Sequence, residues 1–209
     1  MNDLKNNIEL IINRHFPESD FRLYRRDYTS FIISGNYLSK AINYYKNEGR
    51  EVNVLKWFSD FWVFFEISLI ENKDNFPKIF VNLSVFQGEE DDSHKNQLFR
   101  ADWDNYDSTQ IHPQPHWHFY PNKYDYKTTA DFESFLTLSD ETGFDSYLKK
   151  HNRNLIDLSK IHFTMSGTWF INGTNKSIIH NVDDEQILFD WFSGLLGHIR
   201  EQLEYAASS

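Results

Sequence analysis

The chain has no cysteine among its 209 residues. A disulfide-bonded scaffold and a metal site with thiolate ligands are therefore both excluded, and this absence is typical of a cytoplasmic protein. The sequence also lacks a phosphate-binding glycine loop, a nucleophile elbow and a dinucleotide-binding fingerprint. No motif in the sequence therefore names a reaction.

Long apolar runs are missing as well. The longest, residues 61–70, contains Glu66 and is too short to span a bilayer. The first five residues are polar and open an amphipathic pattern, which is not how a signal peptide begins. We therefore expect a cytoplasmic protein that does not engage a membrane.

Basic residues are too few to balance the acidic ones. The chain has 21 Lys and Arg against 31 Asp and Glu, which gives a formal net charge of −10. Because this charge repels phosphate backbones, broad binding to nucleic acid is not favoured. The basic run at 149–153 is the obvious local patch that would admit RNA, although such runs are typical of a solvated helix face.

Aromatic residues, in contrast, make up 17% of the chain. Each buries a large area, so a chain of this length can fold around a substantial core without crosslinks. With no internal repeat, low-complexity tract or linker, residues 1–209 are predicted to form a single domain. The many Asn, Lys, Ile, Tyr and Phe residues resemble the usage of an AT-rich bacterial genome.

Hydrophobic periodicity predicts helices at both ends of the chain and strands between them. Residues 3–15 have helical spacing, and so does the stripe from Ile187 to Leu203, where Asp183 and Gln186 form a capping-box pattern. Other helices are predicted at 36–49, 129–138 and 144–151, and a late hairpin at 160–170 and 177–181. The remaining predicted strands are 31–34, 52–58, 61–70, 78–86, 97–104 and 115–120.

The connections between the later strands are short enough for hairpins, which favours antiparallel pairing over crossover helices. The predicted fold class is therefore α+β, an antiparallel β-meander packed against amino- and carboxy-terminal helices. Alternation along the strands then sorts the side chains by face. If Trp103 and Trp117 both face the core, the opposite face collects Arg100, Asp102, Asp104, His116 and His118, together with Glu66, Ser68, Asn82 and Ser84.

Two interpretations of this polar face compete. An antiparallel sheet often turns one face to water. Histidine and arginine, however, are not the usual residues of a solvated strand, which favours a functional site.

The densest local feature is the heptapeptide HPQPHWH at residues 112–118. Histidines at positions i and i+2 of a strand project from the same side, about 6–7 Å apart at the backbone. The imidazoles of His116 and His118 can therefore converge on one ion, with His112 reaching over and Asp102 or Asp104 as a carboxylate ligand. A divalent metal such as zinc or manganese suits these ligands. The alternative is that both histidines are hydrogen-bonding surface residues.

The same residues support a mechanism without a metal. One histidine would act as general base and the other as general acid, while Arg100 stabilises an anionic transition state. This set suits cleavage of RNA, in which the 2′-hydroxyl is the nucleophile. Alternatively, Arg100 only forms an ion pair with Asp102 or Asp104 on the sheet face.

The stretch LFRADWDNY at 98–106, followed by His112 and PHWH at 115–118, resembles the TumE-like toxin family. Those small bacterial proteins are similar in pairing an R-x-D-N-type strand with an H-x-H strand at the end of a meander. The resemblance spans about residues 60–120, and the insertion of residues 101–103 before Asp104-Asn105 departs from the family pattern. It carries over Arg100, Asp102 or Asp104, Asn105, His116 and His118, and implies a toxin- or defence-associated role with RNA as the target.

Two functional hypotheses follow. The first is a bacterial intracellular hydrolase or nuclease-like protein with Arg100, Asp102, Asp104, His116 and His118 as catalytic residues. The second is a non-catalytic acidic binding protein, such as an antitoxin, an immunity protein or a complex subunit, because an acidic surface can mask a basic protein partner. A third arrangement, a small-molecule-binding protein, requires the sheet to curl closed with its polar face inside.

Overall fold

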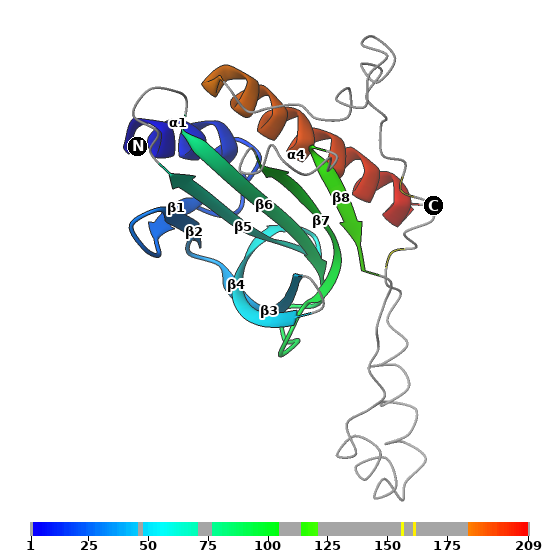
Figure 1. Cartoon of the computed structure of the whole chain (residues 1–209). Helices are drawn as coiled ribbons and strands as arrows, with labels where there is room; N and C mark the ends of the chain where they lie inside the picture. Colours follow the sequence, from blue (N-terminus) through cyan, green and yellow to red (C-terminus); the bar gives the residue numbers. More distant parts are fainter. Residues whose placement is uncertain are drawn as a thin grey trace, which may run out of the picture.

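The computed structural model describes residues 2–45, 48–70, 77–104, 114–120, 156, 161 and 184–208. The helices predicted at 129–138 and 144–151, the basic run at 149–153 and, apart from Ile161, the late hairpin lie outside the described residues. The described elements, in chain order, are α1 (Asn2–Asn13), β1 (Arg22–Arg25), β2 (Ser30–Ser34), β3 (Leu38–Tyr45), β4 (Glu48–Phe58), β5 (Phe61–Ile70), β6 (Lys78–Gln87), β7 (Asn96–Asp104), β8 (His116–Phe119) and α4 (Glu185–Ser208) (Figure 1).

The eight strands form one sheet in which the named strands pair antiparallel. Strands β4 to β8 are consecutive in the chain and adjacent in the sheet, as a meander requires. β2 joins β5 beyond the point where β4 leaves it, and β1 pairs with β2. The predicted α+β fold, a meander with a helix at each end, is confirmed.

The helix predicted at 36–49 is wrong, because most of this segment is strand β3. Its helical spacing came from Leu38, Ala41, Ile42 and Tyr45, yet Leu38 and Tyr45 are exposed. The apolar positions therefore do not mark one buried face. Eight consecutive residues pair instead with β4, and isoleucine and tyrosine are residue types enriched in strands.

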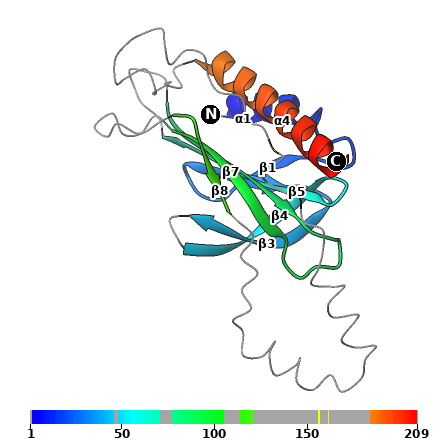
Figure 2. The ribbon, with the colours of Figure 1, turned by 90° about the vertical axis from the view of Figure 1, so that its right-hand side faces the viewer.

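Both helices pack on the apolar face of the sheet (Figures 1 and 2). Aromatic contacts join this face to α4: the rings of Phe65 and Phe192 lie 4.9 Å apart, as do those of Trp103 and Trp191. Of the helices that the structure describes, neither has the length and apolar character needed to cross a membrane. Because both helices lie on the apolar face, the opposite, polar face of the sheet is left to be covered by other elements.

The cap of α4 differs in detail from the prediction. Asp184, one residue after the predicted Asp183, accepts hydrogen bonds from the backbone N–H groups of Gln186 and Ile187, at 2.7 and 3.2 Å. Asp183 itself lies outside the described residues. Within the predicted stripe Ile187 is exposed, whereas its other members pack against the core: Trp191, Leu195, Ile199 and Leu203.

The β3–β4 hairpin bends across the polar face of the sheet (Figure 2). Its far edge reaches the start of β7, where Ala41 forms a parallel bridge with Lys95 and the Lys95 N–H donates to the Lys40 carbonyl at 2.8 Å. The sheet thus curls back on itself. The hairpin and its neighbours bury polar residues that a flat sheet would expose, namely Asn82, Ser84, Arg100 and Asp102. A solvated polar face is therefore wrong for these residues.

Candidate functional site

Strand register sets the polar side chains of the sheet in adjacent rows. One row consists of Glu66, Asn82, Asp102 and His116, each paired with the next across β5 to β8. The neighbouring row contains Ser84, Arg100 and His118. Because residues two apart on a strand share a face, both rows point towards the β3–β4 hairpin. The face assignment predicted from alternation is thus the one that the structure has.

Arg100 and Asp102 form a buried ion pair at the centre of these rows. Nε and Nη2 of Arg100 lie 2.9 and 2.7 Å from Oδ2 of Asp102, and the side chains are only 2% and 3% exposed. The guanidinium also donates from Nη1 to the Tyr44 carbonyl at 2.6 Å and lies over the Tyr45 ring, 4.7 Å from its centroid. The pair therefore links β7 to the hairpin and fixes the direction of the carboxylate.

The two histidines of β8 converge on this carboxylate. Nε2 of His118 lies 3.3 Å from Oδ2 of Asp102, and Nε2 of His116 lies 3.9 Å from it. The two Nε2 atoms are 2.8 Å apart. The side chains of Asp102, His116 and His118 are 3%, 16% and 39% exposed, so the cluster opens to solvent on the His118 side.

These three residues can hold a metal ion. Each offers one ligand atom, and the atoms lie within 4.8 Å of one another. Ligands bound at about 2.0–2.1 Å in a tetrahedral site are about 3.3 Å apart, and the observed separations of 2.8, 3.3 and 3.9 Å bracket that value. Oδ1 of Asp102 is buried and accepts no hydrogen bond from the described residues. An unsatisfied buried carboxylate oxygen is costly unless something binds there.

The other predicted site residues are placed differently. Oδ2 of Asp104 accepts a hydrogen bond from Nε2 of Gln114 at 2.7 Å, and its backbone N–H donates to Oε1 of the same residue at 3.1 Å. Among the described residues the carboxylate that joins the histidines is therefore that of Asp102. His112 and Asn105 lie outside the described residues.

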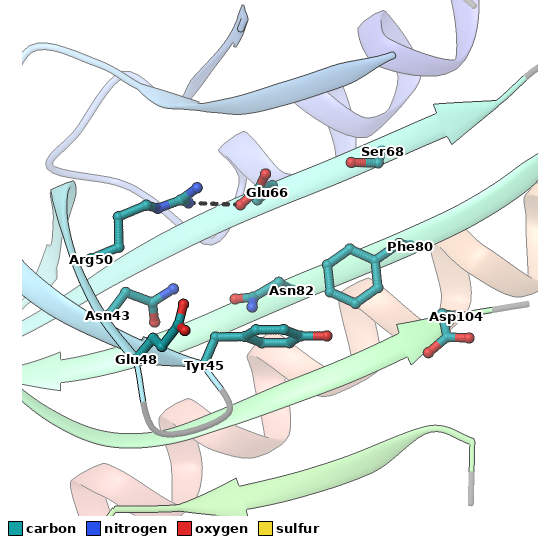
Figure 3. Close-up of a pocket in the computed structure, with 9 residues that line it drawn as sticks. All are labelled: Asn43, Tyr45, Glu48, Arg50, Glu66, Ser68, Phe80, Asn82 and Asp104. Carbon is teal, nitrogen blue, oxygen red and sulfur yellow. Dashed lines mark hydrogen bonds and ion pairs between the residues drawn. The ribbon is translucent and has the colours of Figure 1, made fainter. Parts of the chain in front are cut away.

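Next to the cluster, the hairpin and the sheet enclose a pocket of about 590 Å³ (Figure 3). The hairpin lines it with Asn43, Tyr45, Glu48 and Arg50, and the sheet with Glu66, Ser68, Phe80, Asn82 and Asp104. Nη2 of Arg50 bridges the two walls with a bond of 2.9 Å to Oε2 of Glu66 (Figure 3). Pockets of this size hold small-molecule ligands.

Sequence reasoning missed the hairpin side of this pocket because it predicted a helix there. The signal that could have found it is alternation, since Asn43 and Tyr45 stand opposite Arg50 and Glu48 in the hairpin. Tyr120 was also missed as a contact between walls: its hydroxyl donates to the Tyr44 carbonyl at 2.8 Å. Burial raises the pKa of Tyr120, and the nearby Asp102 carboxylate acts in the same direction while Arg100 opposes it. The phenol therefore remains a hydrogen-bond donor at neutral pH.

Comparison with known proteins finds no family model, curated protein or solved structure that matches this chain significantly.

Proposed function

We propose that Asp102, His116 and His118 bind one divalent metal ion, zinc or manganese, and that the protein is a metal-dependent hydrolase. The observation that carries this proposal is the convergence of three ligand atoms within 4.8 Å on the polar face of the sheet. Two histidines and one carboxylate leave further coordination positions for water and substrate, as catalytic sites require.

The spacing of the histidines favours a metal over paired acid–base catalysis. With 2.8 Å between them, the two Nε2 atoms are already at hydrogen-bond distance and leave no room for a phosphate group. A general acid and a general base that act on opposite sides of a scissile bond need to flank it. Atoms that converge on one point suit a single shared ion instead.

The surrounding residues have distinct parts in this proposal. Arg100 holds Oδ2 of Asp102, the oxygen that lies 3.3 and 3.9 Å from the two histidine nitrogens, and so fixes where the carboxylate stands relative to them. His118 is the most exposed of the three ligands, at 39%, so water reaches the ion on its side of the cluster. When bound, the metal supplies an activated water nucleophile at neutral pH. Arg100 is a positioning residue here, because it is 1% exposed and acts through the carboxylate.

The biological setting belongs to the same proposal. The resemblance of about residues 60–120 to TumE-like toxins supports a toxin- or defence-associated role in a bacterial cytoplasm. RNA remains a candidate substrate on that ground, although the net charge of −10 is unfavourable for it.

A non-catalytic binding protein is the second candidate, and one observation favours it. Large side chains are exposed near the β1–β2 hairpin and the start of β3: Tyr24 is 65% exposed, Tyr28 88% and Tyr37 51%. Exposed tyrosines are frequent anchors of protein interfaces. Loss of partner capture on replacing these tyrosines, with no effect of His118→Ala, would favour this candidate.

Hydrolysis of p-nitrophenyl acetate and bis(p-nitrophenyl) phosphate tests the enzyme proposal. We expect a chelator to abolish turnover of at least one substrate, zinc or manganese to restore it, and His118→Ala to lower it at least about tenfold. His94→Ala is the matched control, because His94 pairs with Glu51 at 3.2 Å in an exposed ion pair outside the cluster. Turnover that survives both the chelator and His118→Ala, or no turnover of either substrate by the metal-loaded protein, would refute a hydrolase centred here.

A further inference from the structure

We propose that the pocket between the β3–β4 hairpin and the sheet binds an uncharged nucleoside, through a flat ring and several hydroxyl groups. This inference rests on the proposed function in taking the pocket as the substrate side of the Asp102–His116–His118 centre. Asp104 lines the pocket, and it lies two residues beyond Asp102 on the same face of β7. Residues two apart on a strand are about 6–7 Å apart, so a ligand in the pocket reaches the cluster.

The charges that line the pocket oppose a phosphorylated ligand. The lining contains the carboxylates of Glu48, Glu66 and Asp104 and the guanidinium of Arg50. Glu66 binds Arg50 and also Arg26, so both cations are already engaged by one carboxylate. Counting Arg26, three carboxylates against two guanidinium groups leave one net negative charge. A phosphate would meet like charge here, whereas hydroxyl and amino groups would find acceptors.

The aromatic side chains of the pocket suit a flat ring. Phe80 belongs to the polar face of β6, between Ser68 and Asp104 in its cross-strand row, and is only half-buried. A phenylalanine at a polar position leaves apolar area that a ring can cover. Tyr45 enters from the hairpin wall (Figure 3). Its ring also lies over the Arg100 guanidinium, 4.7 Å from the ring centroid. The two rings thus offer apolar surface on both walls of the pocket.

Amide groups in the same pocket can read the edge of such a ring. Asn82 lines the pocket at 3% exposure, and its Oδ1 lies 3.1 Å from the Ser84 hydroxyl, which is also 2.8 Å from Oδ1 of Asn43. Burial of this side chain restricts its motion before any ligand binds, which reduces the entropy lost on binding. In protein–DNA complexes, asparagine side chains form paired hydrogen bonds with the edge of adenine. Glu48 has no ion-pair partner among the described residues and is open to a ribose hydroxyl.

Ligand-observed NMR and calorimetry with adenosine, cytidine, AMP and CMP test this inference in the full-length, metal-free protein. We expect at least one nucleoside to bind about tenfold or more tightly than its 5′-monophosphate. Phe80→Leu should weaken the binding of that nucleoside by about tenfold, because base–aromatic stacking is lost. Tyr28→Leu, at an exposed ring outside the pocket, is the matched control and should have no effect.

A second variant tests the pocket without changing Phe80, whose buried part also packs within the protein. Glu48→Gln removes one lining carboxylate at the exposed end of the hairpin. Because less negative charge then opposes the phosphate, the ratio of adenosine affinity to AMP affinity should fall a few-fold. Glu51→Gln, on the same strand but absent from the lining, should not. Tighter binding of the phosphates than of the nucleosides, or no nucleoside binding at millimolar concentration, would overturn the inference. Nucleoside binding that survives in His118→Ala, together with failed hydrolysis, would refute the enzyme proposal alone.

Discussion

Replacing Asp102 by asparagine leaves Arg100 as a buried charge without its counter-ion. Both side chains are at most 3% exposed, so water cannot take the place of the carboxylate. Removing one partner of a buried pair costs about 3–5 kcal/mol. Arg100 keeps its bond to the Tyr44 carbonyl and its contact with the Tyr45 ring, which places the expected loss at the lower end, about 3 kcal/mol.

Urea denaturation followed by tryptophan fluorescence and circular dichroism measures this loss. With a denaturant slope of about 2 kcal/mol/M, a loss of about 3 kcal/mol lowers the midpoint by about 1.5 M. The double variant Arg100→Met/Asp102→Asn should recover at least half of the loss, because no uncompensated charge remains. A loss below about 1 kcal/mol for Asp102→Asn, or a double variant no more stable than the single one, would refute the buried pair.

The double variant also separates the structural part of the pair from its functional part. If Arg100 and Asp102 only hold the hairpin on the sheet, a stable double variant should behave as the wild type in every binding assay. If Asp102 is a metal ligand, the same stable variant should lose metal affinity.

Two further predictions concern stability. Burial and neighbouring arginines lower the pKa of His15, so the folded protein resists protonation of this side chain and should lose stability as pH falls below about 6.5. Between pH 7 and 5 the melting temperature should therefore fall less steeply for His15→Gln than for the wild type. The same fall in both proteins would contradict this. Gly35→Ala would place its Cβ 2.5 Å from the Asp20 carbonyl oxygen and should cost about 1–3 kcal/mol. Gly194→Ala meets no atom within 4 Å on α4 and should add up to about 1 kcal/mol; the reverse order of the two glycine variants in thermal denaturation would contradict the packing described.

The meander was predictable because its strands are rich in β-branched and aromatic residues and short connections separate them. Residues 61–70 were predicted as one strand and form β5 with the same bounds. The alternation along β7 and β8 also placed Arg100, Asp102, His116 and His118 on one face, since a period of two leaves only two choices of face per strand. The identity of the residues that share a face thus follows from local pattern.

The carboxylate that meets the histidines was not predictable in the same way. Asp102 and Asp104 share a face, and a register shift of two residues would exchange them without changing any face. The observed pairing of Asp102 with His116 selects Asp102. Sequence pattern fixes faces, but this choice depends on the long-range register between two strands.

The pocket was not predictable because it depends on a hairpin that crosses the sheet. Leu38 and Tyr45 are exposed apolar residues. Their spacing is that of a helical apolar stripe, but it does not correspond to a buried face. The contact that closes the hairpin over the polar face, Ala41 with Lys95, joins residues 54 positions apart in the chain. No local pattern encodes such a contact.

Metal stoichiometry tests the central claim most directly. The protein would be stripped with a chelator, loaded with zinc or manganese, desalted and measured by elemental analysis, alongside His118→Ala and the matched His94→Ala control. We predict about one ion per chain for the wild type and for His94→Ala, and well below one for His118→Ala. No bound metal in the wild type, or equal amounts in the wild type and His118→Ala, would contradict a metal centre at Asp102, His116 and His118.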